Sequence, residues 1–106
     1  MRKINMREFK VSIFNKDMSK QEVDYALKDS IIEIIFNPAL KLNGTRLLKQ
    51  NDLAKKVLDA EDELLLEDEE YNRLKDALEK VEGLGKNDVI LVERVINAEK
   101  VEIQAK

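Results

Sequence analysis

The chain of 106 residues contains no histidine, no cysteine and no tryptophan. Without histidine and cysteine it lacks the side chains that most often serve as proton shuttles, nucleophiles and soft-metal ligands. Three glycines and one proline are too few for a long flexible linker, and no run of 18 apolar residues predicts a membrane-spanning helix. These absences favour a protein that binds or assembles over one that catalyses. We therefore expect no enzymatic activity, no bound metal and no cofactor.

The absence of cysteine fits a reducing compartment. Residues 1–5, Met-Arg-Lys-Ile-Asn, also lack the apolar region of a secretory signal. We therefore expect the protein in the cytoplasm.

Apolar residues make up 43% of the chain and charged residues 39%. The apolar fraction suffices for a core, while the charged fraction exceeds the quarter of the residues that is usual in globular domains. Lys, Glu and Leu are good helix formers, so a highly charged surface around an aliphatic core is typical of a mainly helical protein. The length is close to the commonest domain size. It predicts a single domain over 1–106, with a core over 7–98 and loose ends at 1–6 and 104–106.

The charges are unevenly divided along the chain. Residues 1–58 hold 12 Lys/Arg against 7 Asp/Glu, whereas residues 59–106 hold 7 against 15. Such a division can steer encounter with a charged partner or favour head-to-tail self-association. Alternatively, folding interleaves the two halves and leaves no net dipole.

The N-terminal third contains β structure and one ambiguous segment. Residues 7–14 alternate apolar and polar side chains, the pattern of a half-buried strand. Ser19 and Glu22 have the spacing of a capping box, which would start a helix over 20–36. Alternatively, residues 23–27 form a second strand that closes a hairpin, and the helix begins near Lys28. The hairpin is favoured because a lone strand leaves backbone groups without partners.

Three later segments have helical periodicity: Arg46–Leu58, Asp68–Glu82 and Asp88–Asn97. Thr45 and Asn87 are the expected N-caps of the first and third of these helices.

Other signals set the expected ends of the elements. Pro38 should end the helix that precedes it, the one that runs to residue 36. Gly83 should close the helix Asp68–Glu82 in a Schellman motif. Residues 101–103 alternate once more and could form a short strand beside the first. The expected fold class is α+β and mainly α, with a small N-terminal β element (strand or hairpin) packed on three to four short helices, and a short C-terminal strand as an option.

Residues 59–70 hold eight acidic side chains and no basic one. A calcium loop is excluded because Leu64 stands where the EF-hand requires glycine. The segment is either a solvated loop leading into a helix whose acidic first turn suits the helix dipole, or a surface for a basic partner. The residues that we select as candidates for partner binding are Leu64, Leu65, Leu66, Glu67, Asp68, Glu69 and Glu70.

Other ligand classes are disfavoured. Asp29 and Glu33 have metal-like i,i+4 spacing, but no histidine or second pair accompanies them. A basic strip within residues 41–56 is offset by a pI of about 5.1 and only 5% aromatic residues, which argues against nucleic acid. We expect a protein partner, including further copies of the chain, and neither nucleic acid nor a membrane.

Four segments resemble small proteins of unassigned function encoded by tailed phages and prophages. They are Leu27–Ile31 (LKDSI), Leu53–Val57 (LAKKV), Leu65–Asp68 (LLED) and Leu74–Lys75. The resemblance covers about residues 7–98. It implies a phage setting, and hence a host-cell cytoplasm, and it brings no known active residues with it.

The leading hypothesis is a non-enzymatic phage or prophage accessory protein that acts through protein–protein contacts, assembling with itself or with a virion or host partner. The apolar runs Ile34–Phe36 and Leu64–Leu66 are accommodated by no single face. Either both fill the core, which is the favoured interpretation, or one is left exposed for self-association, which would support the hypothesis. The alternative is an acidic-surface inhibitor of a host defence or nucleic-acid-processing protein.

Overall fold

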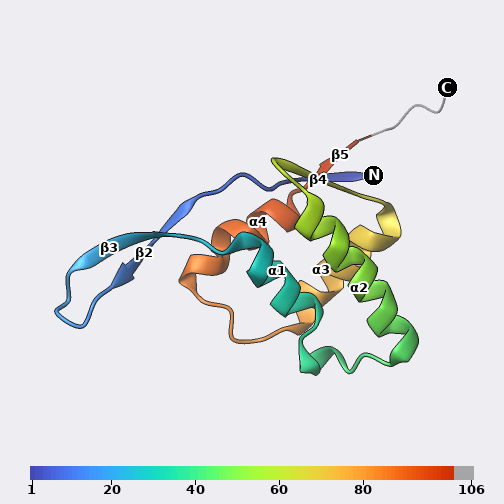
Figure 1. The fold of residues 1–106 in the computed structure, drawn as a ribbon, viewed down its shortest axis with the longest axis horizontal. Helices are drawn as coiled ribbons and strands as arrows, with labels where there is room; N and C mark the ends of the chain where they lie inside the picture. The colour runs from blue at the N-terminus through green and yellow to red at the C-terminus, as the bar shows by residue number, and fades with distance from the viewer. Residues whose placement is uncertain (102–106) are drawn as a thin grey trace.

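The structure is a computed structural model that describes residues 1–101, and it combines helices with two small antiparallel sheets (Figure 1). The α-helices are α1 (Leu27–Ile35), α2 (Gly44–Asp59), α3 (Asp68–Lys80) and α4 (Val89–Ile96), with 3-10 turns η1 (Pro38–Leu40) and η2 (Lys86–Asp88). The strands are β1 (Arg2–Asn5), β2 (Lys10–Phe14), β3 (Lys20–Asp24), β4 (Glu63–Leu66) and β5 (Glu99–Lys100). Within residues 1–101, no helix has both the length and the apolar character needed to cross a bilayer.

The three-stranded sheet has the order β4-β1-β5 and is antiparallel throughout. Ile4 of the central strand lies opposite Leu64 of β4, while Lys3 lies opposite Glu99 of β5. The expected fold class was wrong in this respect: β structure is spread along the chain and is not confined to an N-terminal element. Residues 1–6 are also not a loose end, because they contain the middle strand of this sheet.

The second sheet is the hairpin of β2 and β3, with pairing from Lys10 opposite Asp24 to Phe14 opposite Lys20. It decides the ambiguity of residues 20–27: residues 20–24 are a strand, and α1 begins at Leu27. The hairpin extends away from the helices (Figure 1) and contributes to a molecule of 56 × 34 × 21 Å. Of the predicted C-terminal strand 101–103, residues 102 and 103 lie outside the described residues, as does 104–106.

The helix ends depart from the expectations in three places. Asn43, not Thr45, caps α2, since its Oδ1 accepts the Arg46 N–H at 2.9 Å. Helix α3 ends at Lys80, before Gly83 (φ 87°), so the predicted Schellman ending was wrong. Asn87 lies within η2 and does not cap α4.

The core lies between the four helices and one face of the three-stranded sheet. Alternation along β4 directs Leu64 and Leu66 inward and leaves Leu65 44% exposed on the outer face. The buried Gln50 of α2 donates to the carbonyl of Ile35 at 3.0 Å, which satisfies an end carbonyl of α1 and ties the two helices together. The fully buried large side chains are Ile4, Ile31, Ile35, Leu53, Val57, Leu66, Leu74, Leu91 and Val95.

Candidate functional site

The residues selected from the sequence do not form one surface. Leu64 and Leu66 belong to the core, and Glu70 is only 8% exposed. Four of the seven candidates face solvent and are able to meet a partner: Leu65, Glu67, Asp68 and Glu69. For these four, partner binding stays a prediction.

At the start of α3, the side chain of Glu70 bonds back to the backbone of the N-cap residue, Glu67. Glu70 Oε1 accepts the backbone N–H of Glu67 at 3.1 Å and the ammonium of Lys56 at 2.7 Å. Burial favours the neutral acid, but these two donors outweigh it and lower the pKa of Glu70. Glu70, the last of the four consecutive acids, therefore has a structural role at the helix start.

Most of the remaining acidic side chains in 59–70 have a basic partner within the fold. Counting Glu70, five of the eight acids form ion pairs in the described residues: Asp62 with Arg7, Glu63 with Lys3, Asp68 with the N-terminal amine, Glu69 with Lys49 and Arg73, and Glu70 with Lys56. Their N–O distances run from 2.7 to 3.9 Å. The negative field that the sequence suggests for this segment is thus partly neutralised locally.

The β2–β3 hairpin presents a surface that the sequence analysis did not select. Phe14, the last residue of β2, is 68% exposed, and Met18, within the turn that follows, is 78% exposed. In that turn Asn15 N–H donates to Ser19 O at 2.9 Å, and Asp17 accepts the Ser19 hydroxyl at 2.6 Å. The sequence signal was present, because Phe14 precedes the turn and Met18 lies in it, but alternation alone does not tell how far a hairpin extends beyond the core.

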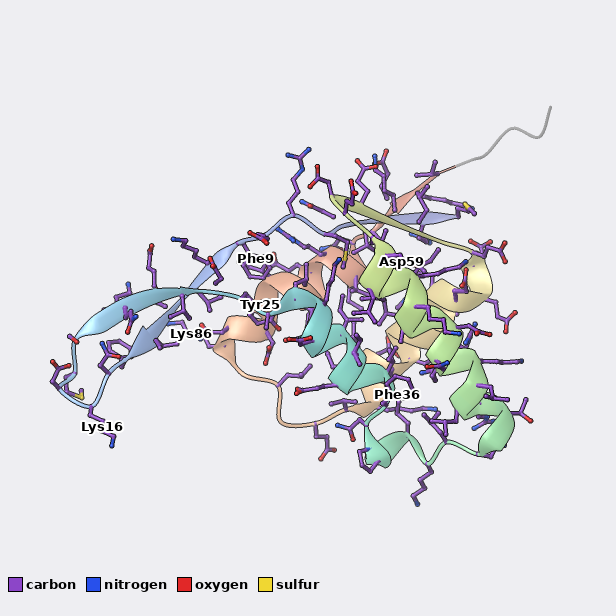
Figure 2. The ribbon with its side chains drawn as sticks, viewed as in Figure 1. Phe9, Lys16, Tyr25, Phe36, Asp59 and Lys86 are labelled. Atoms are coloured by element: carbon purple, nitrogen blue, oxygen red, sulfur yellow. The ribbon has the colours of Figure 1, made fainter. Side chains whose placement is uncertain are left out.

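The base of the hairpin is fixed by aromatic packing. The Phe9 and Tyr25 rings stack with centroids 4.8 Å apart, and Figure 2 shows both where the hairpin joins the helices. On Phe9 the guanidinium of Arg94 lies 4.6 Å from the ring centroid, and Arg94 also donates to the carbonyl of Arg7 at 2.7 Å. Helix α4 therefore holds the start of β2.

Polar contacts with η2 hold the other side of this base. The Tyr25 hydroxyl donates to Asp88 Oδ1 at 2.5 Å, while Asp88 Oδ2 accepts the Gly85 N–H at 2.8 Å. Burial, and then the hydrogen bond to Asp88, raise the pKa of Tyr25 to about 12. Asn87 Nδ2 donates to the carbonyl of Ser12 at 3.2 Å, so η2 also contacts the middle of β2.

Two grooves border the hairpin. One, of about 630 Å³, lies between β2 and η2 and includes Ile13, Phe14 and Ile90 in its lining. The other, of about 860 Å³, lies at the start of α1 and includes Leu27 and Leu58. Both are open and partly apolar, which suits a protein segment better than a small molecule.

The described part of the chain holds no group of three or more acidic side chains placed to bind a metal ion. Comparison of the chain with family models, with curated proteins and with solved structures finds no match.

Proposed function

We propose that this chain is a non-enzymatic protein that acts through protein–protein contacts, with the β2–β3 hairpin as its contact element. The observation that carries the proposal is a projecting hairpin with a strongly exposed aromatic residue, Phe14, and a strongly exposed Met18 beside its tip. A phage or prophage setting, a virion or host protein as partner and a cytoplasmic location form part of the proposal on the strength of the sequence segments alone.

The anchoring of the hairpin at its base favours the binding of a partner. A two-stranded hairpin is marginally stable alone in water, yet this one is anchored at its base through Tyr25, Asp88 and Arg94. Anchoring reduces the conformational entropy that a partner would have to remove on binding. Phe14 and Met18 then provide the large exposed side chains of the kind that typically dominates contact energies.

The acidic-surface alternative has less support. An inhibitor that occupies a basic groove needs free carboxylates, and five of the eight in 59–70 already have cationic partners within the fold. Exposed pairs of this kind are weak and can be exchanged, but their presence reduces the local negative potential.

A matched pair of substitutions tests the hairpin. Phe14 and Leu48 are both 68% exposed, but Leu48 lies on α2, away from the hairpin. Phe14→Ser should weaken complexes of the protein, with itself or with another protein, by about tenfold or more, whereas Leu48→Ser should leave them unchanged. Self-association is measured by sedimentation velocity, and other partners by quantitative pull-down from host lysate with and without phage infection.

Circular dichroism should show both variants folded. Equal effects of the two substitutions would remove the hairpin as the contact element. A wild-type protein that stays monomeric at high concentration and captures nothing would remove the proposed function itself.

A further inference from the structure

We infer that the hairpin binds a second copy of this chain by antiparallel pairing of β3 with β3 across a two-fold axis. The inference rests on the proposed function of the hairpin and names its partner. It follows from which backbone groups of the hairpin are free and from the charges that the pairing brings together.

The hydrogen-bond pattern shows which residues face outward. Tyr25 N–H donates to Phe9 O at 3.0 Å, and Asn15 N–H donates to Ser19 O at 2.9 Å, so these pairs bracket the ladder. In an antiparallel pair, hydrogen-bonded and non-hydrogen-bonded positions alternate. With the observed register, Val11–Val23 and Ile13–Gln21 are therefore hydrogen-bonded pairs. The backbone N–H and C=O groups that point away from the hairpin belong to Lys10, Ser12 and Phe14 on β2, and to Lys20, Glu22 and Asp24 on β3.

Among the strand edges of the described residues, that of β3 is best suited to accept a strand. The outer edge of β2 is partly occupied, since the Ser12 carbonyl already accepts from Asn87. Strand β5 has only two residues. On β4 the outward-facing residues are Glu63 and Leu65, so a second copy of this strand would bring no opposite charges together. The edge of β3 has three outward-facing residues, a cation at one end and an anion at the other.

A two-fold axis at Glu22 matches this edge to itself. Lys20 then lies opposite Asp24 of the second copy, and Asp24 lies opposite its Lys20. All three outward-facing residues of each strand meet in hydrogen-bonded positions, where each pair exchanges two backbone hydrogen bonds. The two Lys–Asp pairs stabilise the interface, and the single Glu22–Glu22 pair opposes it. Because the interface is isologous, it closes at the dimer.

The same register gives the exposed side chains at the tip of the hairpin a place to bind on the second copy. Antiparallel pairing places the tip of each hairpin beside the base of the other, and extension of the register puts Met18 level with Ala26 of the second copy. Ala26 and Leu27 line the groove of about 860 Å³ at the start of α1. The exposed side chains at each tip are thus brought to a partly apolar groove of the other copy, and two marginal ribbons become one four-stranded sheet.

Charge reversal with complementation tests the register. Lys20→Glu alone and Asp24→Lys alone each place like charges opposite each other twice in a homodimer. Each should raise the dissociation constant of the dimer about tenfold or more. In an equimolar mixture of the two variants both pairs between positions 20 and 24 are again of opposite charge, and the Glu22–Glu22 pair is the same as in the wild type, so a heterodimer should form with near wild-type affinity. Sedimentation velocity, with one variant fluorescently labelled, measures all three cases.

Two further variants complete the test: one is a control, and the other blocks the proposed pairing. Lys55→Glu reverses an exposed charge on α2 and should not change dimerisation. Glu22→Pro removes an N–H that faces away from the hairpin, so the hairpin keeps its own ladder while the β3–β3 pairing is blocked. Circular dichroism checks that each variant folds, Asp24→Lys in particular, because Asp24 also lies opposite Lys10 in its own hairpin.

A dimer that Glu22→Pro leaves intact, single reversals without effect, or a mixture that fails to recover would each overturn the inference. If the reversals have no effect while Phe14→Ser still abolishes complexes, the hairpin binds something other than the β3 edge of a second copy, and the proposed function stands without this inference. A wild-type chain that is monomeric throughout the concentration range overturns the inference directly.

Discussion

Replacement of Ile4 by alanine tests the central position of β1. Ile4 is 1% exposed and lies in the middle strand of the sheet, against the buried Leu64 of β4. The substitution removes three buried carbons, which at about 0.8 kcal/mol each gives a transfer term of about 2.4 kcal/mol. The cavity left between sheet and helices adds to this term, so we expect a loss of about 3 kcal/mol in the free energy of unfolding. For a protein of ordinary stability, that is a large fraction of the total.

The assay is urea denaturation followed by circular dichroism, with Ile13→Ala as the control. Ile13 has the same side chain, but it lies on the hairpin and is 37% exposed. Its truncation should lower the unfolding free energy by less than about 1 kcal/mol. An unchanged urea slope would show that the folded state is otherwise intact. If Ile4→Ala costs under about 0.5 kcal/mol, residues 1–6 are a loose end after all and the three-stranded sheet is wrong.

Two predictions concern polar contacts of the core. The Tyr71 hydroxyl donates to the Val95 carbonyl at 2.6 Å in a buried site, so Tyr71→Phe should lower the unfolding free energy by about 1–2 kcal/mol in the same urea assay, and an unchanged midpoint would contradict this. The folded-state pKa of Glu70 lies below the ordinary glutamate value of 4.5, so its carboxylate stabilises the fold fully above about pH 4.5, and that contribution is lost as pH falls through the lower, folded-state pKa. Glu70→Gln should therefore cost about 1 kcal/mol at pH 7 and progressively less as the medium is acidified; a difference that stays constant with pH would rule out the ionised pair as its cause.

The sequence predicted the longer helices better than the strands. Apolar side chains at helical spacing, such as Leu74 and Leu78, are a local signal, and α2 and α3 lie within two residues of their expected ends. Strand β1 has no such signal: it is four residues long, and only Ile4 among them is fully buried. Its partners are about 60 and about 97 positions away in the chain, so its pairing depends on tertiary contacts that no local pattern reveals.

The candidate site illustrates the same limit. The run Leu64–Leu66 has no helical face, and the sequence left open whether it is core or interface. A strand settles the question by alternation, because two of its leucines point inward and Leu65 points outward. The acidic first turn of α3 was expected from the helix dipole, but the hydrogen bond from the Glu67 N–H to the Glu70 carboxylate required the structure, since the capping motif expected from sequence begins with Ser or Thr.

The ion pairs of the fold mostly join the basic half of the chain to the acidic half. Six of the seven ion pairs of the described residues join a cation from residues 1–58 to an anion from residues 59–106, and only Arg73–Glu69 lies within one half. Several of them connect β1 and α2 to β4 and the start of α3, the elements that have to find each other across the sequence. Complementary halves thus favour the native pairing within one chain, and the division predicts little about an external charged partner. Among the described residues, the outer edge of β3 and the exposed side chains of Phe14 and Met18 lie together on one projecting element, which is why we propose the hairpin as the contact element.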